Sequence, residues 1–512
     1  MRFIAILALL AGIPLSAQQP GRFSDVSGRS GLKIAANTGV GGTNPHAVAV
    51  EDFNGDGLAD VILLTFGKPH IYYFRNRGQL RFEDITRGSG LENFAGEGTG
   101  AAAADFDGDG ILDLYLTSLR NGESRLYKGN KDGTFSDVSA RAGVLLKSPA
   151  RSCAWSDVDG DGWPDLYVCC PEGPNLLFRN NRDGTFTNIA RAAGVELADR
   201  HSLGCVFGDV DGDGRDDLFV SNYRSQPSAL FRNDGNGKFT DMTVAAGLSR
   251  RASAVGCVFA DVFNTGRLDL LVTTDSWLSG ANYTETELLK MKHTVEPNLL
   301  YRNDAGGKFT PVAGDFSTLK TLSHDAIIED LDHDGLPDIY VTVDAESGNR
   351  WATSKGGNRL WTRPGGKNWQ EASRAWGIHH EANCVCAAAA DFDNDGDLDL
   401  LLVNFYSQPV LYRNETNNKN WLRVKVNGKA GNRHGLGARI SLWDDRDGKR
   451  RLVGTRHIHS GAGYCRSSPL EAHCGLGNSP SANYRLEVRF PVTRKSIIRE
   501  SVAPGQRIVI NE

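Results

Sequence analysis

The chain has 512 residues, of which 40% are hydrophobic and 23% charged, and its formal net charge is −5. This is the composition of a soluble globular protein, and it excludes a low-complexity chain because the 59 glycines fall at recurring turn positions. The length allows two or more domains. The chain contains no basic run that would indicate binding to nucleic acid.

The N-terminus has the three parts of a secretory signal peptide. One basic residue, Arg2, precedes an apolar stretch from Phe3 to Leu15, and small residues follow. A buried strand or a membrane anchor is the alternative, but the stretch is too short to span a bilayer comfortably. We therefore expect cleavage after Ala17 and a secreted or periplasmic protein without a membrane span.

A nine-residue acidic loop recurs seven times between short apolar runs. The first residues of successive copies lie 53, 52, 52, 52, 69 and 61 positions apart. A period of this size indicates a repeat architecture. The copies are Asp52–Asp60, Asp105–Asp113, Asp157–Asp165, Asp209–Asp217, Asp261–Asp269, Asp330–Asp338 and Asp391–Asp399.

Each repeat contains four predicted strands. In the second repeat, residues 101–104 precede the loop and residues 113–117 follow it; in the fourth, residues 230–233 and 238–242 complete the unit. The runs are too short for helices and are bounded by Gly, Asn and Asp. Four strands in about 50 residues are typical of a propeller blade. The sequence predicts an all-β fold with a seven-bladed β-propeller over residues 18–418.

The two ends of the repeat region complement each other. Residues 21–32 match the outer part of a repeat, such as residues 133–144, but no acidic loop precedes them. The seventh repeat stops matching after Asn414. We expect the N-terminal strand to complete the seventh blade and close the ring, because closure removes exposed sheet edges.

The repeats vanish after Asn420. Alternating strands are predicted at residues 421–426, 438–443, 485–490 and 507–512, which indicates a small β-sandwich over residues 419–512. An insertion at residues 277–297, with a short segment of helical character at 285–292, is expected to decorate one rim of the ring.

The acidic loops have the composition of calcium sites. Ca²⁺ takes six to eight oxygen ligands, and loop positions 1, 3, 5 and 9 supply carboxylates or an amide. The backbone carbonyl of position 7 is a further expected ligand, and the glycine at position 6 of every copy permits the sharp turn. Position 12 lies within a strand, which excludes an EF-hand. The loops offer many oxygens and no His or Cys ligand, which argues against a magnesium or zinc site. The alternative is a set of solvated Asp-Gly turns.

Six loops are expected to bind about six Ca²⁺ in total. In the fifth loop, Phe263 and Thr265 replace the acids at positions 3 and 5, so that loop is expected to persist as a turn without metal. We expect the loops to act as joints of the blades that face away from any partner. The predicted ligands are Asp52, Asn54, Asp56, Leu58, Asp60, Asp105, Asp107, Asp109, Ile111, Asp113, Asp157, Asp159, Asp161, Trp163, Asp165, Asp209, Asp211, Asp213, Arg215, Asp217, Asp330, Asp332, Asp334, Leu336, Asp338, Asp391, Asp393, Asp395, Asp397 and Asp399.

Basic side chains precede several of the innermost predicted strands. Because ring symmetry brings equivalent loops together, they form a candidate ligand rim; the alternative is a set of unrelated surface residues. No nucleophile elbow, phosphate loop or zinc signature is present, so no catalytic residue is assigned. The rim residues are His46, Arg151, His201, His324, His379 and His380.

Nine cysteines leave at least one unpaired within the chain. Cys153, Cys205 and Cys257 each lie four residues before their loop, where Ala101 stands in another repeat, so they are expected to be small buried residues. In an exported protein some disulfides are expected, and a bridge between Cys465 and Cys474 is the most plausible.

The pattern DxDxDGxxD, followed by an apolar strand, L-[FY]-R-N and G-x-F, resembles the FG-GAP/VCBS repeat of integrin α-subunit propellers over residues 21–414. The C-terminal segment resembles the ASPIC/UnbV domain. That second match rests on Asn432, Arg433, Gly435 to Arg439, Gly463, Tyr464, His473, Gly475 to Gly477 and Val488 to Phe490. The order of the two parts is that of the cartilage acidic protein family, although the chain lacks a Cys-rich EGF-like module, which favours a bacterial exported relative.

The resemblance implies calcium binding and an extracellular setting, but no firm reaction. The expected function is that of an extracellular binding or adhesion module for a protein or glycan. The protein is expected to be a monomer, to bind no nucleic acid and to have no membrane span. The alternative is a secreted or periplasmic enzyme, for example of secondary metabolism, with a site in the rim loops. Convergence of the rim histidines within hydrogen-bond reach would favour the enzyme.

Overall fold

The computed structural model describes residues 22–35, 43–275, 296–313, 321–344, 357–429, 431–446, 449–461, 463–478, 480–481 and 483–512. The predicted signal peptide, residues 1–17, and the segment 285–292 lie outside these residues. None of the helices in the described ranges has the length and apolar character needed to cross a membrane.

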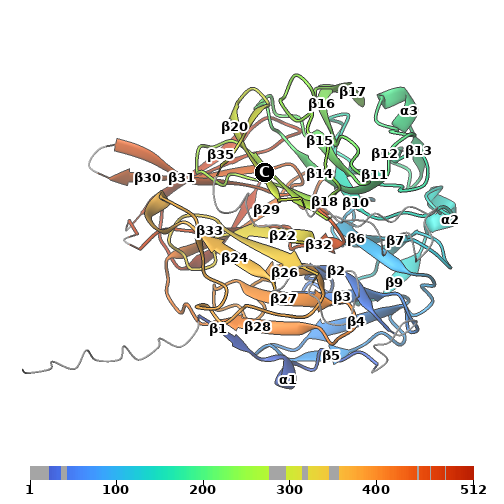
Figure 1. Ribbon diagram of the computed structural model, residues 1–512, viewed down its shortest axis with the longest axis horizontal. Coiled ribbons are helices and arrows are strands. Elements are labelled where there is room, and N and C mark those ends of the chain that lie inside the picture. The colour runs from blue at the N-terminus through green and yellow to red at the C-terminus, as the bar shows by residue number, and fades with distance from the viewer. Residues whose placement is uncertain are drawn as a thin grey trace, which may run out of the picture.

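Within the described residues, the repeats form seven sheets arranged around a ring, each with four antiparallel strands in order from inside to outside (Figure 1). The prediction of an all-β fold with repeated four-stranded sheets is confirmed. The innermost strands are β2 (Pro45–Glu51), β6 (Gly98–Ala104), β10 (Cys153–Ser156), β14 (Ser202–Gly208), β18 (Ala254–Ala260), β22 (Ser323–Glu329) and β26 (Cys384–Ala390). Each contacts the innermost strand of the next repeat, and β26 contacts β2.

The second strand of each sheet begins at the last aspartate of its acidic loop. These strands are β3 (Asp60–Thr65), β7 (Asp113–Ser118), β11 (Asp165–Val168), β15 (Asp217–Asn222), β19 (Asp269–Thr274), β23 (Asp338–Val343) and β27 (Asp399–Asn404). Every one of their residues is buried, because neighbouring sheets cover both faces.

The outer half of each sheet is less buried. The third strands are β4 (Ile71–Asn76), β8 (Arg125–Gly129), β12 (Leu176–Asn180), β16 (Ala229–Gly235), β20 (Leu299–Ala305), β24 (Arg359–Thr362) and β28 (Val410–Asn414). The outermost strands are β5 (Phe82–Asp84), β9 (Phe135–Asp137), β13 (Phe186–Asn188), β17 (Lys238–Asp241), β21 (Lys308–Pro311), β25 (Gln370–Glu371) and β1 (Phe23–Asp25).

Short helical turns lead from some outer strands to the next repeat. The α-helical turns end at a glycine with positive φ, which a residue with a side chain rarely adopts. These turns are α1 (Ser27–Ser30), α2 (Ser139–Ala142) and α3 (Ala190–Ala193); the 3₁₀ turn η2 (Pro364–Gly366) instead joins β24 to β25 within the sixth sheet.

The N-terminal strand closes the ring, as expected. β1 pairs antiparallel with β28, with Phe23 opposite Asn414, and serves as the outermost strand of the seventh sheet. The Phe23 ring stacks on Trp376 at 6.4 Å between centroids, and Ser24 Oγ donates to Glu415 Oε1 at 2.7 Å. In Figure 1 the first strand therefore lies beside the last strands of the repeats.

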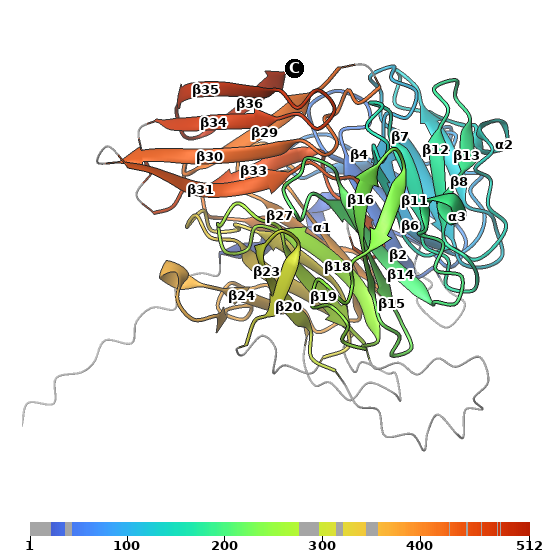
Figure 2. The same cartoon turned by 90° about the horizontal axis from the view of Figure 1, so that it is seen from above.

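The C-terminal domain consists of two sheets beside the ring (Figure 2). The order of one is β33 (Glu471–Gly475), β29 (Trp421–Asn427) and β36 (Gln506–Asn511); the order of the other is β31 (Lys449–His457), β30 (Arg439–Arg446), β34 (Tyr484–Arg489) and β35 (Ser496–Val502). The four strands predicted from the sequence are present. The sequence did not predict that β29 pairs in parallel with β36. The alternation of apolar and polar residues marks strands but does not set the order of strands in a sheet.

Part of the C-terminal domain lies inside the ring. We call residues 458–461 and 463–469 the channel segment. Its strand β32 (Arg466–Ser467) pairs in parallel with β2, and Ser460 and Gly463 form bridges with β10 and β14. The segment also hydrogen-bonds to β6, β22 and β26 and comes close to β18. It therefore fills the space that the seven innermost strands enclose.

Glycine and one buried ion pair adapt this segment to the channel. A Cβ on Gly461, at φ 72°, would lie 2.3 Å from the carbonyl oxygen of Cys153. Arg466 Nε lies 2.8 Å from Asp325 Oδ2 on β22, and both side chains are buried. The main chain can approach the innermost strands only because side chains are absent or paired at these points.

The expected disulfide is wrong. All nine cysteines are free thiols, and all are buried. Cys465 belongs to the channel segment, where Sγ lies 3.4 Å from His46 Nδ1, whereas Cys474 lies on β33 opposite Leu422. The expectation that Cys153, Cys205 and Cys257 are buried is confirmed.

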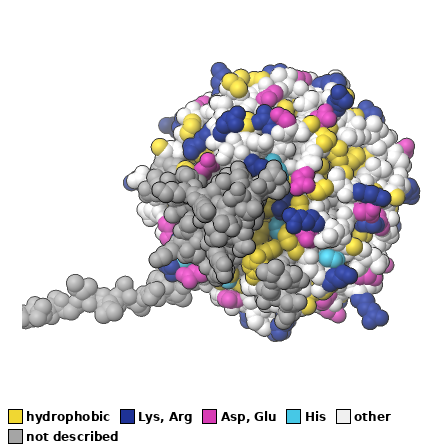
Figure 3. Space-filling model, turned by 45° about the vertical axis from the view of Figure 1, so that its right-hand side comes forward, with side chains coloured by type: hydrophobic (Ala, Val, Ile, Leu, Met, Phe, Trp, Pro, Cys, Tyr) yellow, Lys and Arg dark blue, Asp and Glu magenta, His cyan; other side chains and the backbone are white. Residues whose placement is uncertain are grey.

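Charged side chains are mixed on the surface. On the face drawn in Figure 3, basic and acidic side chains alternate without a broad region of one sign.

Removal of the closing strand tests ring closure. Deletion of residues 18–34 is expected to lower the melting temperature strongly, because β28 becomes an open edge and Phe23 leaves its buried site. Thermal unfolding followed by circular dichroism measures the change. A synthetic peptide of residues 18–34 should restore part of the loss. Equal melting temperatures for both proteins would contradict the closure.

Two glycine substitutions test the fit of the channel segment. Gly461→Ala and Gly184→Ala both place a side chain at positive φ, 72° and 82°, but only Gly461 meets other atoms. The overlap is expected to cost about 1–3 kcal/mol more at Gly461 than at Gly184. Denaturant unfolding measures both, and equal losses would show that the segment is not tightly held.

Candidate metal loops and rim cavity

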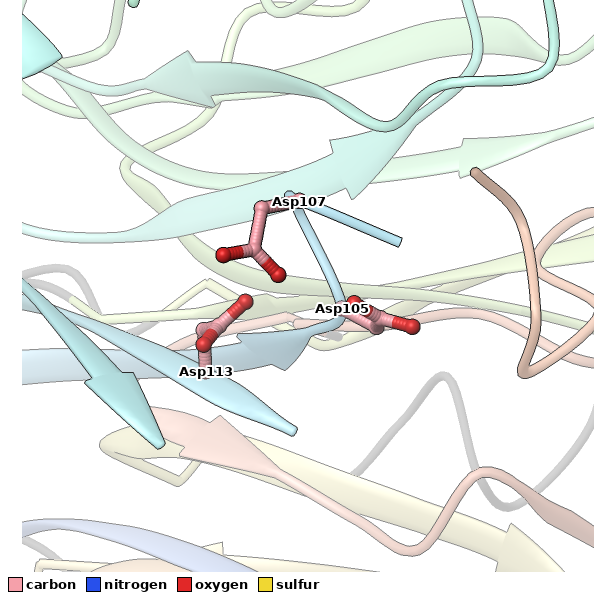
Figure 4. A group of neighbouring side chains, drawn as sticks. All are labelled: Asp105, Asp107 and Asp113. Carbon is pink, nitrogen blue, oxygen red and sulfur yellow. The ribbon is translucent and has the colours of Figure 1, made fainter. Parts of the chain in front are cut away.

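The acidic loops gather carboxylates at the end of the innermost strands. In the second loop, Asp105, Asp107 and Asp113 lie side by side (Figure 4), and one oxygen of each lies within 4.8 Å of the others. Asp105 follows β6 and Asp113 begins β7. The same arrangement recurs in four further loops, formed by Asp157, Asp159 and Asp165; Asp209, Asp211 and Asp217; Asp330, Asp332 and Asp338; and Asp391, Asp393 and Asp399.

Backbone donors hold the first carboxylate of each loop. Asp105 Oδ1 accepts from the amide of Asp109 at 3.0 Å, and Oδ2 accepts from the amide of Gly110 at 2.8 Å. Gly110 has φ 89°, which permits the turn that points both amides inward. The fifth loop keeps these contacts, since Asp261 accepts from the amides of Thr265 and Gly266.

The ninth carboxylate joins three parts of the sheet in five of the seven described sheets. Asp113 Oδ1 accepts from the amide of Gly129 on the third strand at 2.9 Å, and Oδ2 accepts from the amide of Phe106 in the loop at 2.9 Å. Asp165, Asp217, Asp269 and Asp399 make the same pair of bonds. The ninth position is thus a structural acceptor as well as a predicted ligand.

Side chains at the ends of six of the seven third strands tie a blade to its neighbour, whereas the second blade has Gly129 at this position. Asn180 Nδ2 donates to the carbonyl of Phe106 in the preceding acidic loop at 2.8 Å. Asn76, Asn233, Asn303 and Asn414 bind the neighbouring loop in the same way. In the sixth sheet Arg363 stands at this position and donates from Nη2 to the carbonyl of Val262 at 2.8 Å. Its guanidinium also lies 4.8 Å from the centroid of the Phe263 ring. Phe263 belongs to the fifth loop, which lacks acids at positions 3 and 5.

Burial opposes the negative charge of the loops. It raises the pKa of Asp105 to about 6 and that of Asp157 to about 7, and neighbouring carboxylates act in the same direction. The pKa of Asp113 is raised well above its ordinary value for the same reasons. Asp107 Oδ1 and Asp393 Oδ1 are buried without a hydrogen-bond partner. An oxygen-only donor set that is crowded, buried and incompletely paired fits a hard cation.

Basic side chains form ion pairs mainly with the carboxylates at loop positions 3 and 5. Lys128 pairs with Asp107 and Asp109, and Arg182 pairs with Asp161. The first carboxylate of the seventh loop, Asp391, pairs with Arg423 of the C-terminal domain. By contrast, within the described ranges no basic side chain forms an ion pair with the first carboxylates of the first four loops, Asp52, Asp105, Asp157 and Asp209.

The loops lie against the chain's own C-terminal domain. Arg439 donates from Nη2 to the carbonyl of Gly266 in the fifth loop at 2.7 Å, and the amide of Gly477 donates to the carbonyl of His333 in the sixth at 3.0 Å. The sequence alone did not indicate this contact. This contact makes the loops part of the interface between the ring of sheets and the C-terminal domain.

A cavity of about 380 Å³ lies at the opposite end of the innermost strands. Four of the six predicted rim residues line it: His46, Arg151, His201 and His324. The other two do not reach it. His379 Nδ1 lies 2.9 Å from Arg359 Nη1, and His380 Nδ1 lies 3.5 Å from the Tyr412 hydroxyl.

β-Bulges turn side chains into this cavity. The register between β2 and β3 shifts at Pro45 and Ala47, and His46 lies between them. A corresponding shift in β22 contains His324. A bulge redirects the side chain that it inserts. Three further lining residues, Leu203, Val255 and Val385, lie in the bulges of β14, β18 and β26.

The pKa values of the cavity histidines shift in different directions. Burial lowers the pKa of His46 well below its ordinary value and that of His201 to about 4, so both are neutral at pH 7. Burial also opposes the charge of His324, but Asp275 outweighs it and raises the pKa. His324 Nε2 lies 3.8 Å from Asp275 Oδ2.

Sequence reasoning missed several residues of the cavity. Tyr464 reaches it from the channel segment, and Phe66, Tyr223, Phe405 and Tyr406 supply aromatic walls. Tyr464 stands in the Gly-Tyr pair that carries the C-terminal resemblance, which was a signal that this residue matters. Nothing in the local sequence placed it beside His46 or Arg151, because more than 300 residues separate them.

Comparison with known proteins agrees with the resemblance noted in the sequence. A family model described as FG-GAP-like repeat matches residues 52–116, 113–168, 157–220, 209–272 and 350–402, which together exceed half of the chain. A model described as ASPIC and UnbV matches residues 428–512.

The chain is 27% identical over 486 residues to cartilage acidic protein 1 of Mus musculus, covering 87% of this chain and 70% of that protein. It is 26% identical over 500 residues to the Homo sapiens protein, covering 90% and 70%. Integrin alpha-PS3 of Drosophila melanogaster is 28% identical over 189 residues, covering 32% of this chain and 17% of the integrin. The chain belongs to the FG-GAP-like repeat family and carries a C-terminal ASPIC/UnbV domain, with homology to cartilage acidic protein 1 and integrin alpha chains.

Proposed function

We propose that this protein is an exported, calcium-binding propeller that acts as an extracellular binding or adhesion module for a protein or glycan. The N-terminal signal pattern and the relationship to cartilage acidic protein and integrin alpha chains support this setting. The observation that carries the proposal is a cavity on a rigid ring that His46, Arg151, His201 and His324 line, while in the described part of the chain no hydrogen bond joins two of these histidines. Loops on a rigid scaffold are common binding sites.

The calcium ions would be held by loops one to four, six and seven. Their side chains at positions 1, 3, 5 and 9 and the carbonyl at position 7 form oxygen-only sets, and five of these loops already bring three carboxylates together. Bound calcium would neutralise buried charge and stabilise the turn between the two inner strands. Its role is structural, since the loops lie at the C-terminal domain and away from the cavity.

Calcium binding can be counted loop by loop. Calorimetry on chelator-stripped protein is expected to give about six sites with Kd values of ~10⁻⁴ to 10⁻³ M. Asp109→Ala, at position 5 of the second loop, should remove one site. Thr265→Ala, at position 5 of the fifth loop, is the matched control and should leave the count unchanged. The same number of calcium sites in wild type and Asp109→Ala would contradict the assignment of a site to the second loop.

Calcium should also raise thermal stability. At a tenfold excess over Kd, each independent site adds about 1.4 kcal/mol to the free energy of unfolding. Scanning calorimetry with calcium and with EDTA measures the difference, and magnesium serves as the control cation. Unchanged unfolding in EDTA would contradict the structural role.

A binding screen tests the rim face. We expect a partner from protein and glycan arrays in calcium buffer whose binding is weakened by substitution of His201 or Tyr406 at the cavity mouth. His379→Ala, outside the cavity, is the control. Binding that survives every rim substitution but fails when the C-terminal domain is altered would move the site away from the rim.

An enzyme is the second candidate, and one observation favours it. His324 and Asp275 form a pair in the cavity, and His46 and His324 both lie near the ring of Tyr464. A His–carboxylate pair can move a proton between substrate atoms. Turnover of a bound ligand that is lost in His324→Gln, with binding retained, would distinguish the enzyme from the binding module.

A further inference from the structure

The rim cavity is closed at its inner end. The channel segment occupies the ring, and Tyr464 at its tip lines the cavity. The amide of Val48 donates to the carbonyl of Cys465 at 3.0 Å, and Ser152 Oγ donates to the carbonyl of Gly463 at 3.2 Å, which fixes the tip on two sides. A ligand must therefore enter from the rim face, and the C-terminal domain contributes one wall.

Arg151 and Arg120 are the arginines that line this cavity, and the carboxylates of Glu97, Asp275 and Asp344 line it as well. Arg151 Nη1 donates to the Tyr464 hydroxyl at 3.0 Å and lies 3.4 Å from His46 Nε2. Both partners are uncharged, since burial lowers the pKa of His46 and raises that of Tyr464. Nε is buried without a hydrogen-bond partner. In the described part of the chain no carboxylate forms an ion pair with Arg151.

The backbone holds Arg151 in place. Its amide donates to the carbonyl of Cys169 at 2.9 Å, and its own carbonyl accepts from Thr117 Oγ1 at 2.7 Å. These bonds fix the backbone from which the side chain extends, and the Tyr464 hydroxyl holds Nη1. The guanidinium is thus a positioned donor, and its Nε has no hydrogen-bond partner. A guanidinium of this kind binds a carboxylate through two parallel hydrogen bonds.

The rest of the cavity supplies apolar and polar walls. Phe66 stacks on His46 at 4.4 Å between centroids, and Phe405 meets Phe66 edge-on at 5.4 Å. Tyr406 is 37% exposed and stands against Phe405. Aromatic faces of this kind pack against the face of a ring. The pair His324–Asp275, which Tyr223 contacts through its hydroxyl at 3.4 Å, offers donors and acceptors for hydroxyl groups.

We propose that the cavity binds a small ring-bearing carboxylate, with Arg151 as the partner of the carboxylate and the aromatic walls against the ring. The inference rests on the proposed function in that it places the ligand on the rim face. A volume of about 380 Å³ lies in the range of small-molecule sites and accommodates one ring. Two sources share this chemistry: the terminal uronic acid of a glycan and a free hydroxylated aromatic acid.

Titration with defined probes tests the ligand class. Saturation-transfer NMR and calorimetry on the whole protein, in calcium buffer, compare glucuronate and 4-hydroxybenzoate with their methyl esters. We expect at least one acid to bind about 10- to 100-fold more tightly than its ester, because the ester loses the charge-assisted bonds. The acid that binds identifies the source. An ester that equals its acid, or the absence of binding by either acid, overturns the proposal.

Variants assign the effect to Arg151. Arg151→Gln should weaken acid binding by the same 10- to 100-fold and leave ester binding unchanged. Tyr464→Phe should weaken acid binding several-fold, since it removes an oxygen that positions the guanidinium. Arg191→Gln, on the exposed surface of α3, is the matched control. Thermal unfolding shows that each variant is folded.

The outcomes separate this inference from the proposed function. If Arg151→Gln binds the acid as wild type does, the carboxylate site is wrong. If an array partner binds the rim face and neither Arg151→Gln nor Tyr464→Phe changes its affinity, the proposed binding function is supported and this inference fails. If acid binding requires Arg151 but no array partner exists, the cavity is a small-molecule site and the adhesion function fails.

Discussion

A buried carboxylate at the end of each acidic loop determines how this propeller is assembled. The ninth aspartate accepts one amide from its own loop and, in most sheets, a second from the third strand, so a single side chain fixes the loop, the second strand and the third strand. Such a carboxylate is costly to bury unless its lone pairs are satisfied. The neighbouring asparagine then extends the connection to the next blade. Calcium, where bound, adds to a joint that backbone donors have already formed.

The period of the repeat made much of this predictable. Regular spacing, strand-length apolar runs and the orphan fragment at residues 21–32 were sufficient for the sheet order and for closure by β1. The fifth loop shows the limit. Phe263 and Thr265 indicate a loop without its full acid set, but only the structure shows that Asp261 and Asp269 keep the turn through backbone bonds. In sequence, a ligand and a structural acceptor look the same.

The cavity was less predictable for physical reasons. The side chains of His46 and His324 enter it because bulges shift the strand register, and no local signal marks a bulge. His379 and His380 precede an equivalent strand and point elsewhere, so position in the repeat was not sufficient. Tyr464 belongs to another domain. The supposed Cys465–Cys474 bridge failed for the same reason: the channel segment carries Cys465 away from the sheet that contains Cys474.

The channel segment also imposes an order of assembly. The residues that fill the ring are synthesised after every strand that surrounds them, while the strand that closes the ring is synthesised first. The buried Arg466–Asp325 pair can therefore form only after the channel segment has been synthesised. A chain truncated before residue 458 would retain all seven sheets yet leave Asp325 without its cation in a solvent-filled pore. The centre of the ring is thus completed by residues that follow all of its strands along the chain.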